Sequence, residues 1–311
     1  MLNKNQYIIS SNIKEAIEFS KSKENTKFIA GGTDLMVNYQ QGNQELKYLI
    51  DITNIKELYG FTIQDSYLKI GALETLKSIS LNNKISSEFP LLKNAALSVG
   101  SPLIRKTATI GGNILCENRC IFYNQSQWWR DSAGLCLKCD GDICIATKGK
   151  KACFSQLASD TAPALIAMDA KLEIYDNTGS KMVNIEDIYT GDGVSSINIS
   201  DKELITSILL PINRNFKTSY HKLRQRESID FTSATVAVAI DKQENIKVAI
   251  SGLDPKAIVI SSDKSNFNAN ELIKKAKKQA RIVDNDIYSR KYRKNMMEVF
   301  LKRSFKELDL I

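Results

Sequence analysis

Six cysteines are gathered between positions 116 and 153 of this 311-residue chain, and the rest of the sequence contains none. Cysteines chosen for core packing would be scattered along the chain. A group this dense indicates that several thiolates are needed in one place, which is typical of a metal centre. The six are Cys116, Cys120, Cys136, Cys139, Cys144 and Cys153.

Three chemistries are compatible with this spacing. Tetrahedral zinc is typically held by paired C-x2-C motifs, and only Cys136 and Cys139 form such a pair. The same pair could be redox-active, although no thioredoxin-like strand precedes it. A [4Fe–4S] cluster needs four thiolates and can take them from a widely spaced loop. Spacing alone leaves all three open.

Two glycine pairs are candidates for cofactor binding. Gly31-Gly32-Thr33-Asp34 follows a short apolar segment and precedes a predicted helix, and Gly111-Gly112-Asn113 could form a second loop of this kind. Glycine lets the backbone come close to a bound group, and amides at a helix start suit a diphosphate. A tight structural turn is the alternative for each pair. Neither Rossmann nor P-loop spacing is present, so a dinucleotide would bind in another manner.

The regular elements that must position these residues fall into three groups. Strands at 7–10, 27–30 and 48–51 alternate with helices at 13–20 and 35–41. Asn12 and Glu15 would cap the first of these helices. A strand pair at 60–63 and 67–72 and helices at 74–81 and 90–99 lead to an irregular segment at 116–153. A buried helix at 162–167 and strands at 171–175, 182–184 and 204–210 follow. In the last third of the chain, the sequence pattern predicts strands at 216–223, 234–240 and 246–251. It also predicts helices at 269–282 and 286–302.

Composition is that of a globular protein, with 43% hydrophobic and 25% charged residues. No apolar run is long enough to span a bilayer, and residues 1–6 lack an apolar signal core. We therefore expect a cytoplasmic protein without a membrane segment, with reduced thiols. The net charge is +8, and the basic stretch at 274–278 is interpreted as a solvated helix face rather than a nucleic-acid site. His221 is the only histidine, which excludes multi-histidine zinc sites.

Three segments resemble motifs of one family, the FAD-binding medium subunits of molybdenum hydroxylases such as xanthine and carbon monoxide dehydrogenases. They are residues 28–35, 109–114 and 158–165. The resemblance implies an α+β fold: a two-lobed FAD-binding domain of the molybdopterin dehydrogenase (PCMH-like) type at 1–214, interrupted by a cysteine-rich iron–sulfur insert at 116–153. A C-terminal domain of antiparallel sheet and helices would occupy 215–311, with the boundary near 213–215.

The resemblance also implies which residues bind FAD. Asp160 would contact the flavin side or the ribityl hydroxyls. Lys222 matches a basic position near the isoalloxazine, and a surface lysine on a strand is the alternative. The backbone of the two glycine motifs would wrap the diphosphate and ribityl region, through Ile29, Ala30, Gly31, Gly32, Thr33 and Asp34 and through Ala108, Thr109, Ile110, Gly111, Gly112 and Asn113.

The insert resembles one branch of this family. Residues 118–126, with Trp128-Trp129-Arg130, are similar to the beta subunit of 4-hydroxybenzoyl-CoA reductase, whose insert holds a [4Fe–4S] cluster. The resemblance assigns the ligands to Cys120, Cys136, Cys144 and Cys153. Cys116 and Cys139 are then spare, with Cys139 the main competitor because it lies close to Cys136. The two tryptophans are expected to pack around the insert.

The function implied by the resemblance is electron transfer, with no catalytic residue on this chain. Electrons from a ferredoxin-like donor would pass through the [4Fe–4S] cluster and FAD to [2Fe–2S] centres on a small partner subunit. They would then reach a molybdenum cofactor on a large subunit, which would remove the phenolic hydroxyl of 4-hydroxybenzoyl-CoA in anaerobic aromatic degradation. The complex would be a dimer of heterotrimers.

Two alternatives stay open. The chain would serve another molybdenum hydroxylase, such as a xanthine or aldehyde dehydrogenase, if the partner's substrate differs. A basic zinc-loop protein that binds nucleic acid or another protein is the alternative from a different class.

Overall fold

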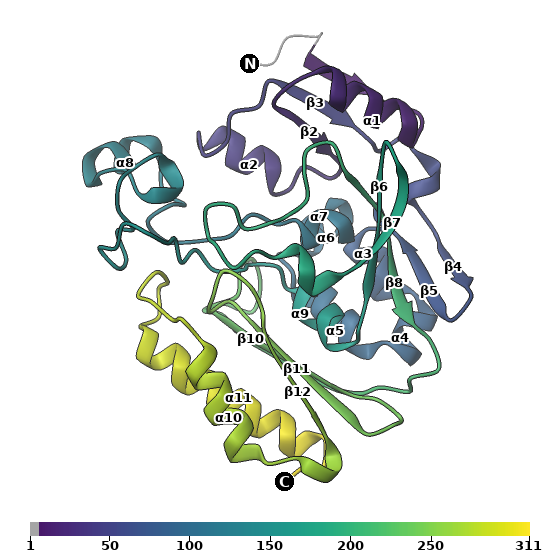
Figure 1. The fold of residues 1–311 in the computed structure, drawn as a ribbon, viewed down its shortest axis with the longest axis vertical. Helices are drawn as coiled ribbons and strands as arrows, with labels where there is room; N and C mark the ends of the chain where they lie inside the picture. Colours follow the sequence, from purple (N-terminus) through teal and green to yellow (C-terminus); the bar gives the residue numbers. More distant parts are fainter. Residues whose placement is uncertain (1–5) are drawn as a thin grey trace.

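The computed structural model describes residues 6–311 and contains three sheets (Figure 1). The first is parallel, in the order β1-β3-β2, and consists of β1 (Tyr7–Ile9), β2 (Thr26–Ile29) and β3 (Tyr48–Asp51). Its crossovers are α1 (Ile13–Ser22) and α2 (Leu35–Gln40), as predicted. Asn12 caps α1 by accepting a hydrogen bond from the Glu15 amide at 2.9 Å. The prediction about an N-terminal signal concerns residues 1–6, of which 1–5 lie outside the described residues.

The second sheet has five antiparallel strands in the order β4-β5-β8-β6-β7. Its members are β4 (Phe61–Gln64), β5 (Tyr67–Gly71), β6 (Lys171–Asp176), β7 (Gly179–Asn184) and β8 (Leu204–Pro211). The central β8 is buried along its whole length. Strands from both sides of the cysteine segment therefore share one sheet, so the segment is an excursion from a single folding unit.

Short helices cover this part of the molecule. They are α3 (Leu76–Leu81), α4 (Asn83–Glu88), α5 (Pro90–Ser98), α6 (Pro102–Thr107), α7 (Ile110–Ile114) and α9 (Thr161–Ala167). Single 3-10 turns occur at η2 (Lys56–Leu58), η4 (Ile185–Ile188) and η5 (Lys264–Asn266). The sequence did not predict α4, α6 or α7, because helices of five or six residues are too short to show a periodic apolar face.

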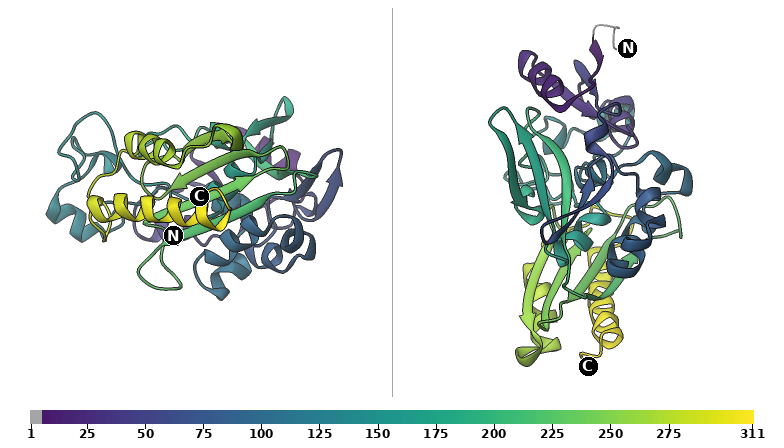
Figure 2. Two further views of the ribbon diagram at one scale, coloured as in Figure 1. Left: turned by 90° about the horizontal axis from the view of Figure 1, so that it is seen from below. Right: turned by 90° about the vertical axis from the view of Figure 1, so that its right-hand side faces the viewer.

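The third sheet is antiparallel, in the order β12-β11-β10-β9, and lies beyond the five-stranded sheet along the long axis (Figure 2). It contains β9 (Lys217–Leu223), β10 (Ala234–Ile240), β11 (Asn245–Ser251) and the unpredicted β12 (Ile258–Asp263). Helices α10 (Ala269–Gln279) and α11 (Arg290–Glu307) pack on one face, and α5 and α9 pack on the other. Because β10 is covered on both faces, all of its residues are buried.

The core runs across the predicted boundary at 213–215. Ala237, Ala239 and Ala249 of the third sheet belong to the same buried cluster as α9. Their small side chains let the helix approach the sheet closely. The division into domains 1–214 and 215–311 stays a prediction, and the two parts share an apolar contact face.

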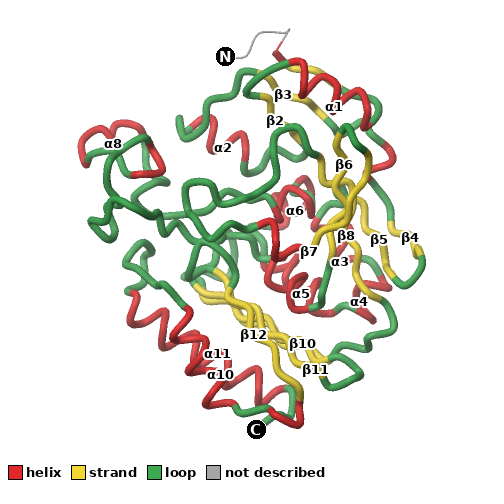
Figure 3. The backbone as a smooth tube through the Cα atoms, viewed as in Figure 1, coloured by secondary structure: helices red, strands yellow, loops and turns green. Residues whose placement is uncertain are grey.

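The cysteine segment is irregular, as predicted, apart from α8 (Gln127–Ala133) and a 3-10 turn, η3 (Leu137–Cys139). Figure 3 shows it as a run of loops beside the sheets, with α8 at the edge of the molecule. Buried Arg130 anchors α8 by donating to the carbonyl oxygens of Gln41 at 3.0 Å and Gln125 at 2.6 Å. No helix among residues 6–311 is long and apolar enough to cross a membrane.

Candidate functional site

The first glycine motif forms the turn between β2 and α2. Gly32 has φ +65°, a left-handed conformation that favours glycine. A Cβ atom on Gly31 would overlap the carbonyl oxygen of Thr107, at the end of α6. Gly31 and Thr33 are exposed, and Ile29, Ala30, Gly32 and Asp34 are half-buried. The turn therefore packs directly against the segment that leads into the second motif, and its outer backbone stays accessible.

The second glycine motif is part of a helix, which corrects the loop expected there. Thr109 is the N-cap of α7, and its hydroxyl accepts a hydrogen bond from the Gly112 amide at 3.2 Å. Gly111 is buried, and a Cβ atom there would lie 3.0 Å from the Ala72 carbonyl oxygen. Gly112 is exposed. The threonine cap overcomes the low helix propensity of the two glycines, because it satisfies an amide at the helix start.

The side chains around the second glycine motif pack in the core or join the motif to α9. Ala108 is 6% exposed and Ile110 is fully buried, so they could reach a ligand only through their backbone. The Asn113 side-chain oxygen accepts hydrogen bonds from the Ser159 hydroxyl at 3.1 Å, and from the Thr161 amide at 3.2 Å and hydroxyl at 2.6 Å. Asn113 thus joins the second glycine motif to the start of α9, which carries the third motif.

Asp160 and Lys222 form a buried ion pair across the boundary between α9 and the third sheet. Their carboxylate and ammonium groups lie 2.8 Å apart, and each side chain is 4% exposed. Lys222 also donates to the carbonyl oxygens of Ser98 and Asp230, each at 3.0 Å. Burial raises the pKa of Asp160, and the charge of Lys222 opposes that rise. Lys222 is therefore not the surface lysine of the alternative prediction.

One oxygen of Asp160 is free for a ligand. Its Oδ1 atom is buried and has no hydrogen-bond partner among the described residues. Buried carboxylate oxygens are normally satisfied by donors. A ribityl hydroxyl or a flavin N–H is a donor of the kind that this atom lacks. Together with the exposed glycine backbone, this orphaned acceptor is compatible with FAD.

Asp34 faces the cysteine insert. Its carboxylate pairs with Arg119 and accepts a hydrogen bond from the Glu117 amide at 3.0 Å. Glu117 in turn pairs with Lys138 at 2.5 Å, and the Lys138 side chain is only 4% exposed. Arg119 directly precedes Cys120 in the chain. Residues 117–119 therefore form a direct structural link between the first glycine motif and the cysteines, which sequence analysis did not anticipate.

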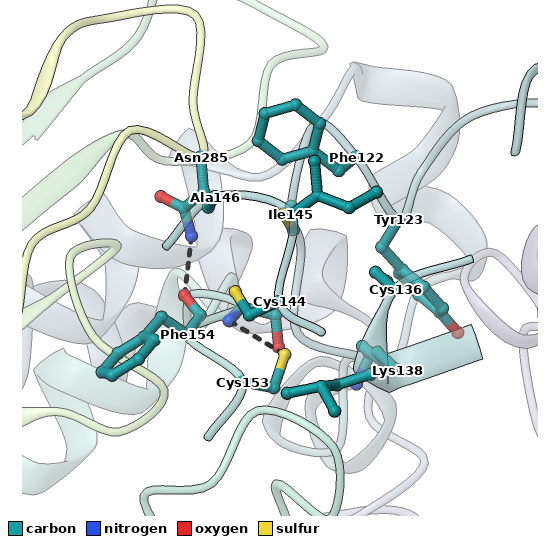
Figure 4. Close-up of a pocket in the computed structure, with 13 residues that line it drawn as sticks. Phe122, Tyr123, Cys136, Lys138, Cys144, Ile145, Ala146, Cys153, Phe154 and Asn285 are labelled. Carbon is teal, nitrogen blue, oxygen red and sulfur yellow. Dashed lines mark hydrogen bonds between the residues drawn. The ribbon is translucent and has the colours of Figure 1, made fainter. Parts of the chain in front are cut away.

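The insert surrounds one cavity, and four of the six cysteines line it (Figure 4). They are Cys120, Cys136, Cys144 and Cys153. These are the four that the family resemblance assigns as ligands. The remaining walls include Tyr123, Lys138, Phe154 and Asn285. The structure thus brings together the predicted ligand set from four separate places in an irregular segment.

Backbone groups fix the positions of these thiols. The Cys153 sulfur accepts a hydrogen bond from the Ser155 amide at 3.5 Å, drawn as a dashed line in Figure 4. The Cys136 carbonyl accepts from the amides of Cys139 at 2.8 Å and Gly141 at 3.0 Å, which closes the η3 turn. The Cys144 amide donates to the Gly149 carbonyl at 2.7 Å and closes the next turn. Tight local turns therefore present the sulfurs inward.

The thiols of the cavity affect one another electrostatically. Burial raises the pKa of Cys120 to about 11, and negative charge on Cys153 or Cys136 adds to the rise. Burial also raises the pKa of Cys153, with a contribution from Cys144. A hydrogen bond from Cys139 lowers the pKa of Cys136 to about 6. These values describe the metal-free thiols and show that the four sulfurs share one electrostatic neighbourhood.

The other two cysteines lie in different surroundings. Cys116 is buried near the first glycine motif, where burial raises its pKa well above normal and Asp34 adds to the rise. Cys139 does not line the cavity, but its hydrogen bond with Cys136 keeps it next to a lining residue. Within residues 6–311, no three histidine, cysteine or acidic side chains converge on a point suited to a single metal ion.

Comparison with known proteins shows which protein family the chain belongs to. The sequence profile of a family described as the FAD binding domain in molybdopterin dehydrogenase matches residues 3–213. The chain belongs to this FAD-binding family. FAD binding and an oxidoreductase context are therefore established at family level.

Individual relatives agree with the family. The glyceraldehyde dehydrogenase medium chain of Sulfolobus acidocaldarius is 24% identical over 97% of each protein. The xanthine dehydrogenase FAD-binding subunit of Escherichia coli O157:H7 is 24% identical over 73% of this chain, and the match spans 65% of that relative, slightly less than two thirds. The fold also matches carbon monoxide dehydrogenase from Hydrogenophaga pseudoflava, with a TM-score of 0.78 and 19% identity over 99% of this chain and 98% of the other.

The comparisons support the broad family expectation and not the narrower one. None of the relatives described above is named a 4-hydroxybenzoyl-CoA reductase. Xanthine and aldehyde-type dehydrogenases, the alternative in the sequence analysis, are closer to what the matches name. The names of these relatives mention neither an iron–sulfur cluster nor a 4-hydroxybenzoyl-CoA reductase role.

Sequence reasoning misjudged or missed several residues of the insert region. Trp128 is 76% exposed, so it does not pack around the insert, whereas Trp129 lies 6.5 Å from the Phe122 ring. Asn285 was missed, because it reaches the cavity from the segment before α11. Gly193 was missed as well: a Cβ atom there would lie 2.7 Å from the Cys153 sulfur. Neither residue belongs to a motif that reveals its role.

Proposed function

We propose that this protein is an electron-transfer subunit that holds FAD at its glycine motifs and a [4Fe–4S] cluster in its cysteine insert. The observation that carries the proposal is the division of the six cysteines: Cys120, Cys136, Cys144 and Cys153 line one cavity, and Cys116 and Cys139 do not. A four-iron cluster takes one thiolate per iron. The cavity offers this number, from buried or half-buried positions.

The FAD would lie against the exposed backbone of Gly31 and Gly112 and the half-buried Gly32, with Asp160 accepting a hydrogen bond through its free oxygen. The Lys222 ammonium, 2.8 Å from the other oxygen of Asp160, keeps that carboxylate in place. Bound FAD exchanges one or two electrons and can therefore connect one-electron and two-electron centres. The protein supplies binding, orientation and shielding from water, and no residue of this chain acts on a substrate.

Residues 117–119 would keep the two cofactors in a fixed relation. Asp34 of the first glycine motif binds Arg119, the neighbour of Cys120, and Glu117 binds the cavity-lining Lys138. Both contacts are largely shielded from water, with side-chain exposures of 4% to 24%. A rigid connection of this kind suits electron transfer, because the transfer depends on a constant separation.

The partners in this proposal are a large molybdopterin-cofactor subunit and a small [2Fe–2S] subunit, assembled as a dimer of heterotrimers. The electron donor is a ferredoxin-like protein. Lys148, Lys150 and Lys151 are exposed beside the cavity loop, and a basic rim there would attract an acidic carrier. If so, the rate of electron transfer falls steeply as ionic strength rises, and a rate independent of salt would contradict this docking site.

For the partner's reaction, the similarity of residues 118–130 to the 4-hydroxybenzoyl-CoA reductase branch favours reductive removal of a phenolic hydroxyl. The second candidate is an oxidative hydroxylase, such as a xanthine or aldehyde dehydrogenase, and the names of the relatives favour it. Isolating the complex and identifying its large subunit, followed by assays with 4-hydroxybenzoyl-CoA, xanthine and aldehydes, distinguishes the two.

The cofactor proposal is tested by anaerobic purification with iron, zinc and FAD analysis and a visible spectrum. We expect four irons and one FAD per chain, in roughly these proportions. Serine at Cys120, Cys136, Cys144 or Cys153 should remove the iron and leave FAD bound. Serine at Cys116 or Cys139 should leave both. A zinc-containing, colourless protein would overturn the proposal, and loss of iron from Cys139→Ser alone would overturn the ligand assignment.

A further inference from the structure

Helix α11 carries a buried cation that has no counter-ion within ion-pair distance. Arg293 is 0% exposed, and no carboxylate among residues 6–311 lies within 4.0 Å of its guanidinium. All of its partners are neutral oxygens: the carbonyls of Ser233, Val283 and Gly252 and the side-chain oxygens of Asn285 and Gln156. Burying a charge without a direct ion pair is expensive, so this position is an unusual one for an arginine.

The nearest carboxylates do not contact Arg293 directly, although Asp286 binds two residues, Gln156 and Ser233, that also bind Arg293. Asp286 accepts hydrogen bonds from the Ser233 hydroxyl and the Gln156 amide, each at 2.8 Å. Asp284 accepts from the Arg290 amide at 2.8 Å. Burial lowers the pKa of Arg293, and the two carboxylates only partly oppose this from a distance. Asp286 therefore offsets part of the positive charge through Gln156 and Ser233, but no carboxylate contacts the guanidinium directly.

This charge lies directly behind the wall of the thiol cavity. Arg293 donates to the Asn285 side-chain oxygen at 3.0 Å, and Asn285 itself lines the cavity (Figure 4). The Asn285 carbonyl accepts a hydrogen bond at 3.1 Å from Ile121, the neighbour of Cys120. A thiolate at Cys120 would also interact favourably with Arg293. Lys138, a cation that lines the cavity, has a direct ion pair with Glu117, so Arg293 is the cation near the cavity without one.

We propose that Arg293 is a positioning residue that supplies the counter-charge for an anionic, four-thiolate iron–sulfur cluster and thereby raises its reduction potential. The inference rests on the proposed function. A cluster with four thiolate ligands is negatively charged, and one-electron reduction by a low-potential donor adds a further negative charge while the donor is oxidised. A buried cation nearby favours the more negative state, because water screens it little.

The test is a redox titration of the cluster in the intact complex, reduced with titanium(III) citrate and followed by electron paramagnetic resonance. In Arg293→Gln the equilibrium constant for reduction should fall at least about tenfold, which is about 59 mV toward negative potential for one electron. Arg293→Lys keeps the charge and should stay within about threefold of the unmodified protein. Lys294→Gln removes the same charge from the exposed side of α11 and is the matched control.

A second variant avoids emptying the buried position. Asn285→Asp would place a carboxylate against Arg293 and cancel its charge without removing the side chain, and it should produce the same negative shift. Unchanged potentials in Arg293→Gln and Asn285→Asp, with iron retained, would overturn the inference alone. Absence of any cluster signal from the unmodified protein would overturn the proposed function as well.

Discussion

The two candidate sites each draw a buried cation from the C-terminal part of the chain, and the two cations are treated differently. Lys222, on the flavin side, is paired with Asp160 at 2.8 Å. Arg293, on the cysteine side, is bound only by neutral oxygens. The first cation has a direct carboxylate partner, whereas the second reaches the Asp286 carboxylate only through Gln156 and Ser233. An anionic group in the thiol cavity would therefore lie near a cation that no carboxylate contacts directly.

The largest effect should come from breaking the paired cation. Lys222→Met leaves the Asp160 carboxylate buried without its partner, and should lower the free energy of unfolding by about 3–5 kcal/mol, measured by chemical denaturation. Combining it with Asp160→Asn should recover part of the loss, because the two residues are coupled. The control is Lys247→Met, whose partner Asp169 is 45% exposed and whose loss should be below about 1 kcal/mol. Equal losses in both would contradict the buried pair.

The next effect separates the flavin side from the cysteine side. A methyl group at Gly31 would overlap the Thr107 carbonyl, so Gly31→Ala must push the two glycine motifs apart. Overpacking of this kind costs about 1–3 kcal/mol, which corresponds to roughly ten- to hundredfold weaker FAD binding. Titration of the flavin-free protein with FAD measures the affinity. Iron content should be unchanged, and simultaneous loss of iron would show that the two sites are not separable.

The reverse experiment uses Gly193, which lies against the thiol cavity. A Cβ atom there would lie 2.7 Å from the Cys153 sulfur and 2.5 Å from the Ser155 hydroxyl. Gly193→Ala should therefore displace one thiol, because overpacking of this kind costs about 1–3 kcal/mol, and the iron content should fall clearly while FAD stays bound. Gly149→Ala, in the cysteine segment itself, would contact only the Thr147 hydroxyl at 3.2 Å and serves as the control. Full iron in Gly193→Ala would argue against Cys153 as a ligand.

The smallest effect concerns the link between the two regions. Arg119→Gln removes the positive charge that holds Asp34 and should loosen the first glycine turn, so that FAD binds about three- to tenfold more weakly. Because Cys120 is the next residue, the variant should also lower the temperature at which the cluster is lost. Arg119→Lys, which keeps the charge, should preserve most of the affinity. No change in either property would mean that residues 117–119 do not couple the sites.

Local sequence signals predicted the elements that are stabilised by interactions between residues close together in the sequence. The Asn12 cap and the β-α-β-α-β unit were predicted because helix capping and apolar alternation each depend on residues that are close together in the sequence. The helix at 110–114 was not, because its glycines indicate a loop and the deciding contact is the Thr109 cap. The family resemblance assigned Asp160 and Lys222 to the FAD site separately, and only the fold brings these two residues, 62 positions apart, into contact.

The cysteine site shows the same limit more strongly. Family resemblance selected the four thiols that share the cavity, whereas the C-x-x-C spacing favoured Cys139, which does not line it. Trp128 was expected to be packed and is exposed, since no pattern of neighbouring residues distinguishes an inward from an outward side chain in an irregular loop. Asn285 and Arg293 could not be predicted, because their role depends on tertiary contacts with a segment more than a hundred residues earlier.

The late position of Asn285 in the chain has a consequence for biosynthesis. Asn285 binds the Phe154 carbonyl at 2.6 Å across 131 residues of sequence, so it leaves the ribosome long after Cys153. Until then one wall of the thiol chamber does not exist. For the proposed iron–sulfur cluster, this order of synthesis would allow insertion on the nascent loop before the segment that carries Asn285 closes the chamber.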